Sequence, residues 1–159
     1  MDYNINILQF IIIILIVYSS SFIGYYIYLL SKDEVKNNII LLKIFSKLIF
    51  LIINFLFFYY AFKETNVLFL ILFFLSITLL VLKAKIEHNL YFSYLAIIFS
   101  ISYFYNVNFY YITILLFIYN LTITSVESIK KKNTLKKIMI KKTSFIIISL
   151  ITILWYLII

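Results

Sequence analysis

The sequence predicts an all-α polytopic membrane protein, a bundle of about six short transmembrane helices that form one integral membrane domain over residues 1–159. Of the 159 residues, 65% are hydrophobic and only 13% are charged, and the mean hydropathy is +1.11. Soluble domains are about half apolar and about a quarter charged, so this chain has too few polar residues to cover its surface in water. The charged residues also gather between long apolar stretches, which is the pattern of loops and spans.

The first apolar stretch, residues 7–30, contains no charged side chain and exceeds the roughly 20 residues that a helix needs to cross a bilayer. A cleavable signal peptide is not expected, because the residues before this stretch carry Asp2 and no lysine and no small-residue cleavage site is evident. After a polar segment, the second and third spans are predicted over residues 43–62 and 67–82, separated by the polar residues 63–66.

The next apolar stretch, residues 90–125, is too long for one helix. It carries no charge and would extend about 54 Å as a helix, against a hydrocarbon core of about 30 Å. The chain must therefore turn back, and Asn-Val-Asn at 106–108 is the predicted turn. This places the fourth and fifth spans at 90–105 and 109–125, and the sixth follows at 143–159. Five spans is the alternative, if one short segment lies in the interface.

The distribution of lysine predicts the orientation of the bundle. With six spans, the first, third and fifth loops and the span ends beside them carry thirteen lysines, whereas the opposite side carries Lys63 alone. The positive-inside rule places the lysine-rich side in the cytoplasm. Both termini are therefore expected on the outer side of the cell membrane.

Small and polar side chains mark the expected helix contacts. Ser20 and Gly24 have the small-xxx-small spacing that lets two helix backbones approach closely in a bilayer. Asn54, in the second span, is expected to form a hydrogen bond with a neighbouring helix. The alternative is that these and the other polar residues near mid-span line a cavity for a small substrate.

One polar stripe is predicted along the second span. Lys43, Lys47 and Asn54 share a helix face, because successive residues of a helix rotate by about 100° and the three are spaced at i, i+4 and i+11. The stripe could guide an anion or a lipid headgroup toward mid-membrane. The alternative is that both lysines extend their ammonium groups to the cytoplasmic interface while Asn54 bonds a neighbouring helix.

Lysines are densest before the last span, in residues 130–142 (KKKNTLKKIMIKK). An apolar stripe of Leu135, Ile138 and Met139 runs among them, so the segment is expected to lie in the cytoplasmic interface against anionic headgroups. The alternative is a loop whose lysines only set the orientation. Nucleic acid is not an expected partner, because no folded domain would present the charge. The lysines assigned to lipid contact are Lys130, Lys131, Lys132, Lys136, Lys137, Lys141 and Lys142.

No catalytic or cofactor motif is found, and cysteine is absent, so neither a cofactor nor a metal site is expected. The six acidic residues lie at span ends or in loops, which argues against a self-contained ion pathway. Glu87 and His88 are the one adjacent pair suited to acid–base chemistry. The leading expectation is a non-catalytic membrane protein, a small subunit that contacts other membrane subunits in a larger complex. A small carrier for a lipid or metabolite is the alternative, and a membrane enzyme is the third reading.

Overall fold

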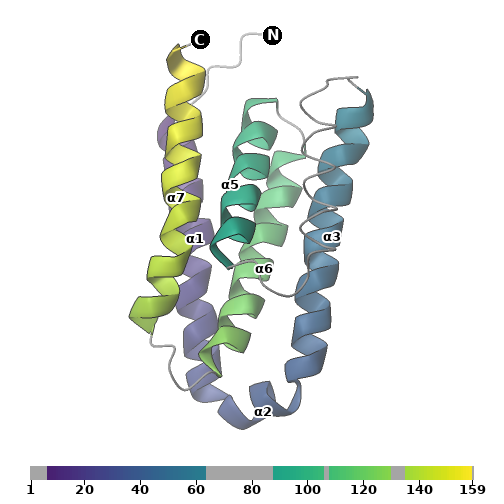
Figure 1. Ribbon diagram of the computed structural model, residues 1–159, viewed down its shortest axis with the longest axis vertical. Helices are drawn as coiled ribbons and strands as arrows, with labels where there is room; N and C mark the ends of the chain where they lie inside the picture. Colours follow the sequence, from purple (N-terminus) through teal and green to yellow (C-terminus); the bar gives the residue numbers. More distant parts are fainter. Residues whose placement is uncertain (1–6, 64–87, 106–107, 130–134, 159) are drawn as a thin grey trace.

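The computed structural model describes residues 7–63, 88–105, 108–129 and 135–158, and over these residues the protein is helical, with no β-strand (Figure 1). The all-α class predicted from composition is therefore confirmed. The helices are α1 (Ile7–Leu30), α2 (Lys32–Asn37), α3 (Ile39–Lys63), α5 (His88–Phe104), α6 (Phe109–Ser128) and α7 (Leu135–Ile158).

Four of these helices are long and apolar enough to cross a membrane. A fifth apolar stretch, Tyr91–Phe104 of α5, would cover only about 21 Å at the rise of an α-helix. The chain is thus a multi-pass helical protein of the transmembrane type. The predicted third span, 67–82, lies outside the described residues. The four long spans are Ile7–Leu30, Ile39–Tyr59, Phe109–Ser128 and Leu135–Trp155.

Several helices have ends that differ from those of the predicted spans. The first helix has the predicted bounds, but α3 begins at Ile39 rather than 43 and α6 continues to Ser128 rather than 125. The largest difference is in α7, which begins at Leu135, eight residues before the predicted start of the last span. Lysine is a good helix former, so the basic residues after 135 extend the helix instead of preceding it.

The polar segment after the first span folds into the short helix α2. Asp33 and Glu34 lie in its first turn and Lys36 in its last, the arrangement that the helix dipole favours. Its one buried residue is Val35, and Lys36 lies 3.9 Å from Asp33. This helix connects α1 to α3 at one end of the bundle (Figure 1).

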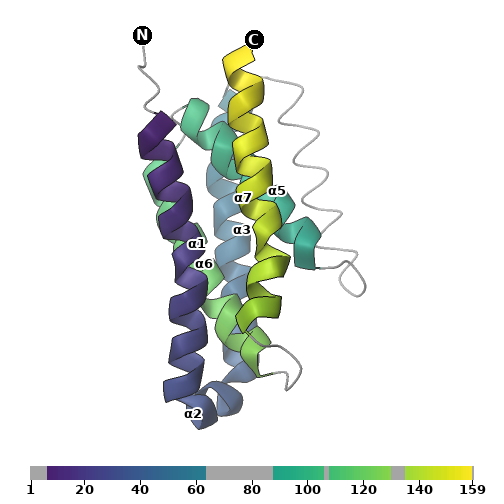
Figure 2. The same ribbon diagram turned by 90° about the vertical axis from the view of Figure 1, so that its left-hand side faces the viewer.

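The arrangement of the bundle centres on α6. Helix α1 packs along one side of α6 and α3 along another, while α7 packs chiefly against α5 (Figures 1 and 2). Helices α1 and α6 run toward the end that holds α2, and α3, α5 and α7 run away from it. The start of α1 and the end of α7 consequently lie at the same end of the molecule.

Of the predicted turn at 106–108, the structure describes Asn108, and residues 106 and 107 lie outside the described residues. Helix α5 ends at Phe104 and α6 begins at Phe109. Between them Asn108 has a φ of 48°, a left-handed conformation that asparagine tolerates better than most residues. Asn108 therefore helps the chain to reverse its direction between α5 and α6, as the length of the apolar stretch requires.

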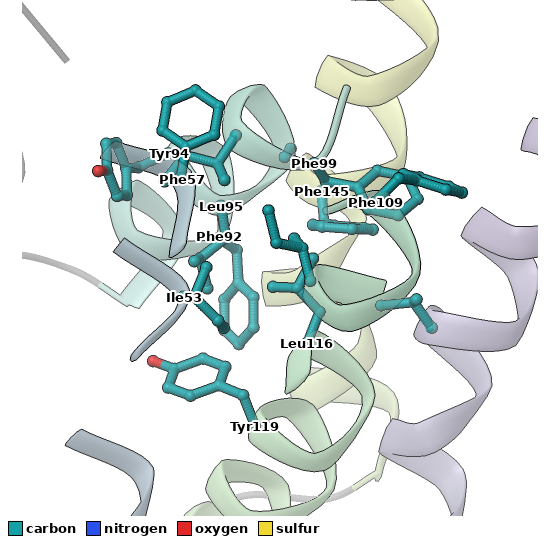
Figure 3. Packing of buried hydrophobic residues seen from close by; sticks show 14 of the residues in the cluster. Ile53, Phe57, Phe92, Tyr94, Leu95, Phe99, Phe109, Leu116, Tyr119 and Phe145 are labelled. Carbon is teal, nitrogen blue, oxygen red and sulfur yellow. The ribbon is translucent and has the colours of Figure 1, made fainter. Parts of the chain in front are cut away.

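Aromatic side chains make up much of the core. Phe99 of α5 lies 5.1 Å from Phe10, 5.3 Å from Phe109 and 5.6 Å from Phe145, measured between ring centroids, so one ring joins four helices. Figure 3 shows Phe99, Phe109 and Phe145 of this group, and below them Phe92 beside Tyr119. Because lipid removes the hydrophobic drive between helices, such close contacts hold the bundle together. Aromatic pairs contribute about 0.5–1.5 kcal/mol each.

Candidate functional site

The most unusual side chain of the bundle is Lys142, which is only 1% exposed. The sequence placed it in a loop against lipid headgroups, and the structure corrects this. Residue 142 belongs to α7, about 10 Å along the axis from the start of the helix. It shares a face with Ile138, Phe145 and Ser149, all of them buried. The ammonium therefore points into the protein and is not available to headgroups.

Polar groups of α6 surround the ammonium. The Lys142 Nζ atom donates to the carbonyl oxygen of Asn120 at 3.3 Å and to the hydroxyl of Thr124. It also lies 4.8 Å from the centroid of the Phe92 ring on α5, a cation–π distance. Lys142 thus links α7 to both α6 and α5.

A second buried ionisable side chain acts on this charge without a direct ion pair. Glu127 is 4% exposed, and its charge attracts that of Lys142. Asn120, Thr124 and Glu127 are spaced at i, i+4 and i+7, so they form one polar face of α6. Glu127 lies in the last turn of α6, at a span end as predicted, but its side chain is buried. We call Asn120, Thr124, Glu127 and Lys142 the lysine cluster.

Helix α1 contacts α6 through two hydrogen bonds to its own backbone oxygens, from Asn120 and Ser125. Asn120 Nδ2 donates to the carbonyl of Val17 at 3.4 Å, and Ser20 Oγ donates to the same carbonyl at 2.6 Å. Ser125 Oγ donates to the carbonyl of Gly24 at 2.9 Å. The lysine cluster is therefore continuous, through Asn120, with the contact between α1 and α6.

Gly24 lies directly against the backbone of α6. A β-carbon at residue 24 would lie 3.1 Å from both the Cα and the carbonyl carbon of Leu121, and closer still to its carbonyl oxygen. The φ of Gly24 is not positive, so space rather than conformation calls for glycine here. Close approach of the two backbones is what allows Ser125 to reach the Gly24 carbonyl.

Several buried polar atoms near these contacts have no hydrogen bond with the described residues. They are Ser21 Oγ on α1, Asn120 Oδ1 on α6 and Ser149 Oγ on α7. Most buried polar groups in proteins have a partner. These three atoms are consequently polar groups of the bundle interior that the described side chains and backbone do not use.

The predicted polar stripe on α3 is divided between two environments. Asn54 is buried: its Nδ2 donates to the Phe50 carbonyl at 2.7 Å, and its Oδ1 accepts a hydrogen bond from the hydroxyl of Tyr94 on α5. Lys43 and Lys47 are exposed on the same flank. Side chains of α5 reach α3 at Phe50 and Asn54, which lie further along α3 than the two lysines.

The remaining predicted sites lie at the surface or outside the described residues. Lys136 and Lys137 are exposed at the start of α7. No group of three potential metal ligands occurs among the residues that the structure describes. Lys130, Lys131, Lys132 and Glu87 lie outside the described residues, as do the side chains of His88 and Lys141.

Comparison with known proteins adds no functional information. No protein family, no curated protein and no solved structure matches the chain. Function must therefore be argued from the geometry of the lysine cluster and of the outer surface.

Proposed function

We propose that the chain is a non-catalytic, multi-pass protein of the cell membrane that packs as a small subunit into a larger membrane assembly. The observation that supports this most is how little of each outer helix the chain itself covers. Only 28% of the residues in the apolar part of α3 are buried, and 35% in that of α7. Large side chains such as Phe55, Tyr59 and Trp155 are about 70% exposed, and they offer wide apolar faces to other helices.

The interior supports the same proposal. The lysine cluster and the pair of Asn54 and Tyr94 join one helix of this chain to another. Polar groups between transmembrane helices contribute about 0.6–2 kcal/mol per hydrogen bond to their association. Their role here is to fix the helix positions, which leaves the outer faces free to contact neighbouring subunits.

Cross-linking in the native membrane tests this proposal. A photoreactive residue is placed at Phe55 on α3 or at Ile151 on α7, both exposed, and at buried Ile53 as the control. We expect a heteromeric adduct of one defined mass from at least one exposed position and none from the buried one. Adducts with lipid alone at both exposed positions would refute the subunit proposal.

The orientation of the subunit is also proposed from the lysines. Lys32, Lys36, Lys43, Lys47 and the start of α7 lie at the α2 end of the bundle, which the positive-inside rule assigns to the cytoplasm. Cysteine at Asn108 should react with a membrane-impermeant thiol reagent in intact cells. Cysteine at Asn37, which is exposed in α2, should react only after permeabilisation, and the reverse pattern would invert the orientation.

A second candidate function is a small carrier for an anionic metabolite or lipid. The observation that favours it is the lysine cluster itself, because ionisable residues inside a membrane often mark substrate paths. An ammonium can bind a phosphate by charge-assisted hydrogen bonds. Proteoliposomes distinguish the two candidates: saturable uptake of glycerol phosphate that the Lys142→Met/Glu127→Gln variant loses would favour the carrier, and its absence would favour the subunit.

A further inference from the structure

Two lysines lie on the outer surface within the apolar part of α3. Lys43 and Lys47 are about 6 Å and 12 Å from the start of the helix at Ile39, and both belong to the stretch long and apolar enough to span a membrane. Both side chains are exposed. Neither ammonium group has an ion pair or hydrogen bond with another described residue.

The contrast with Lys142 shows what these two ammonium groups lack. Lys142 lies at a similar depth in its helix, but a backbone carbonyl, a hydroxyl and the charge of Glu127 stabilise it inside the bundle. A charged side chain in the bilayer is costly unless it finds a partner or reaches the interface. Among the described residues neither the Lys43 nor the Lys47 ammonium group has an ion pair or hydrogen bond, and a phosphate of the headgroup region is a suitable counter-charge for both.

The geometry of the flank fits one phospholipid. Residues four apart on a helix have Cβ atoms about 5–6 Å apart, so one phosphate can accept hydrogen bonds from both ammonium groups. Ile44, Leu51 and Phe55 are exposed and lie within about 80° of Lys47 around the helix axis. Ile44 lies beside the lysines, and Leu51 and Phe55 continue from them toward mid-membrane, where an acyl chain of the same lipid would lie.

We propose that this flank of α3, formed by Lys43, Lys47, Ile44, Leu51 and Phe55, is a binding surface for one anionic phospholipid of the cytoplasmic leaflet. The phosphate bridges the two ammonium groups and one acyl chain packs along the three apolar side chains. A net negative headgroup is required, because a zwitterionic lipid carries its own ammonium group beside the phosphate. The flank is available because all five of its side chains are exposed.

Lipid retention by the full-length protein tests this proposal. The protein is purified from nanodiscs that contain equal amounts of phosphatidylglycerol and phosphatidylcholine, and the lipids retained are counted by native mass spectrometry. We expect one retained phosphatidylglycerol, with occupancy about tenfold or more lower in Lys43→Gln/Lys47→Gln. The matched control is Lys32→Gln/Lys36→Gln, which removes two exposed charges from α2 at the same end of the bundle. It should retain the lipid.

A local probe separates bound lipid from a general effect of charge. With Trp155 changed to phenylalanine and Leu51→Trp introduced, brominated phosphatidylglycerol should quench the fluorescence of residue 51 more strongly than brominated phosphatidylcholine. The glutamine pair at 43 and 47 should remove the difference. Equal quenching by both lipids, or equal loss of lipid in the α2 control, would overturn the proposal. Release of the retained lipid by inorganic phosphate would show an anion site without lipid specificity, which also overturns it.

Discussion

Lys142→Met is expected to destabilise the protein by about 1–3 kcal/mol, the cost of leaving buried polar groups without their hydrogen-bond partner. Methionine is flexible and of similar length, so it should fill the space without a large cavity. It cannot donate to the Asn120 carbonyl or the Thr124 hydroxyl, and it removes the positive charge that attracts Glu127. The free energy of unfolding in mixed micelles, titrated with a denaturing detergent, measures the loss.

Two further variants identify the cause of that loss. Replacing both charges, in Lys142→Met/Glu127→Gln, should recover part of the lost stability, because the Glu127 charge is then no longer buried without that of Lys142. Lys137→Met removes an exposed lysine from the same helix and should change stability by less than about 0.5 kcal/mol. If Lys142→Met is as stable as the parent, or if the double variant is weaker than the single one, the two charges do not act as a pair.

Hydropathy could not predict that the Lys142 side chain points into the bundle, because hydropathy counts charged residues without regard to the helix face on which they lie. The useful signal was the spacing of Ile138, Lys142, Phe145 and Ser149 along α7, which puts the lysine on the buried face of the helix. The pattern begins within residues 130–142, which were predicted as a loop but belong to α7 from Leu135 on. On α6, the matching signal was the spacing of Asn120, Thr124 and Glu127.

The polar stripe on α3 shows a second limit of prediction from the sequence. Helical spacing correctly places Lys43, Lys47 and Asn54 on one flank, since that depends only on the 3.6-residue repeat. Which part of the flank meets a neighbouring side chain, as Asn54 meets Tyr94, is a tertiary property. The class of the fold and the bounds of the first span follow from local composition, whereas the identity of each neighbouring helix does not.

For Gly24, residue spacing predicts one part of the contact and the structure supplies the other. Its spacing from Ser20 predicts a close helix contact, but the sequence does not say which helix approaches. The structure places the backbone of Leu121 there, with Ser125 donating a hydrogen bond to the Gly24 carbonyl. The smallest possible addition, one methyl group, would already collide with backbone atoms, which cannot rotate away as a flexible side chain can.

Gly24→Ala is therefore expected to destabilise the protein, although the same change inside an ordinary helix is favourable by about 0.8–1.0 kcal/mol. The methyl group must push α1 from α6, at the cost of about 1–3 kcal/mol typical of overpacking, and the hydrogen bond from Ser125 weakens as the helices separate. Gly24→Leu should be worse still. Ile23→Leu, at a neighbouring position that is 43% exposed, should leave the thermal midpoint in detergent unchanged. A midpoint for Gly24→Ala at or above that of the parent would mean that α1 and α6 do not meet at this glycine.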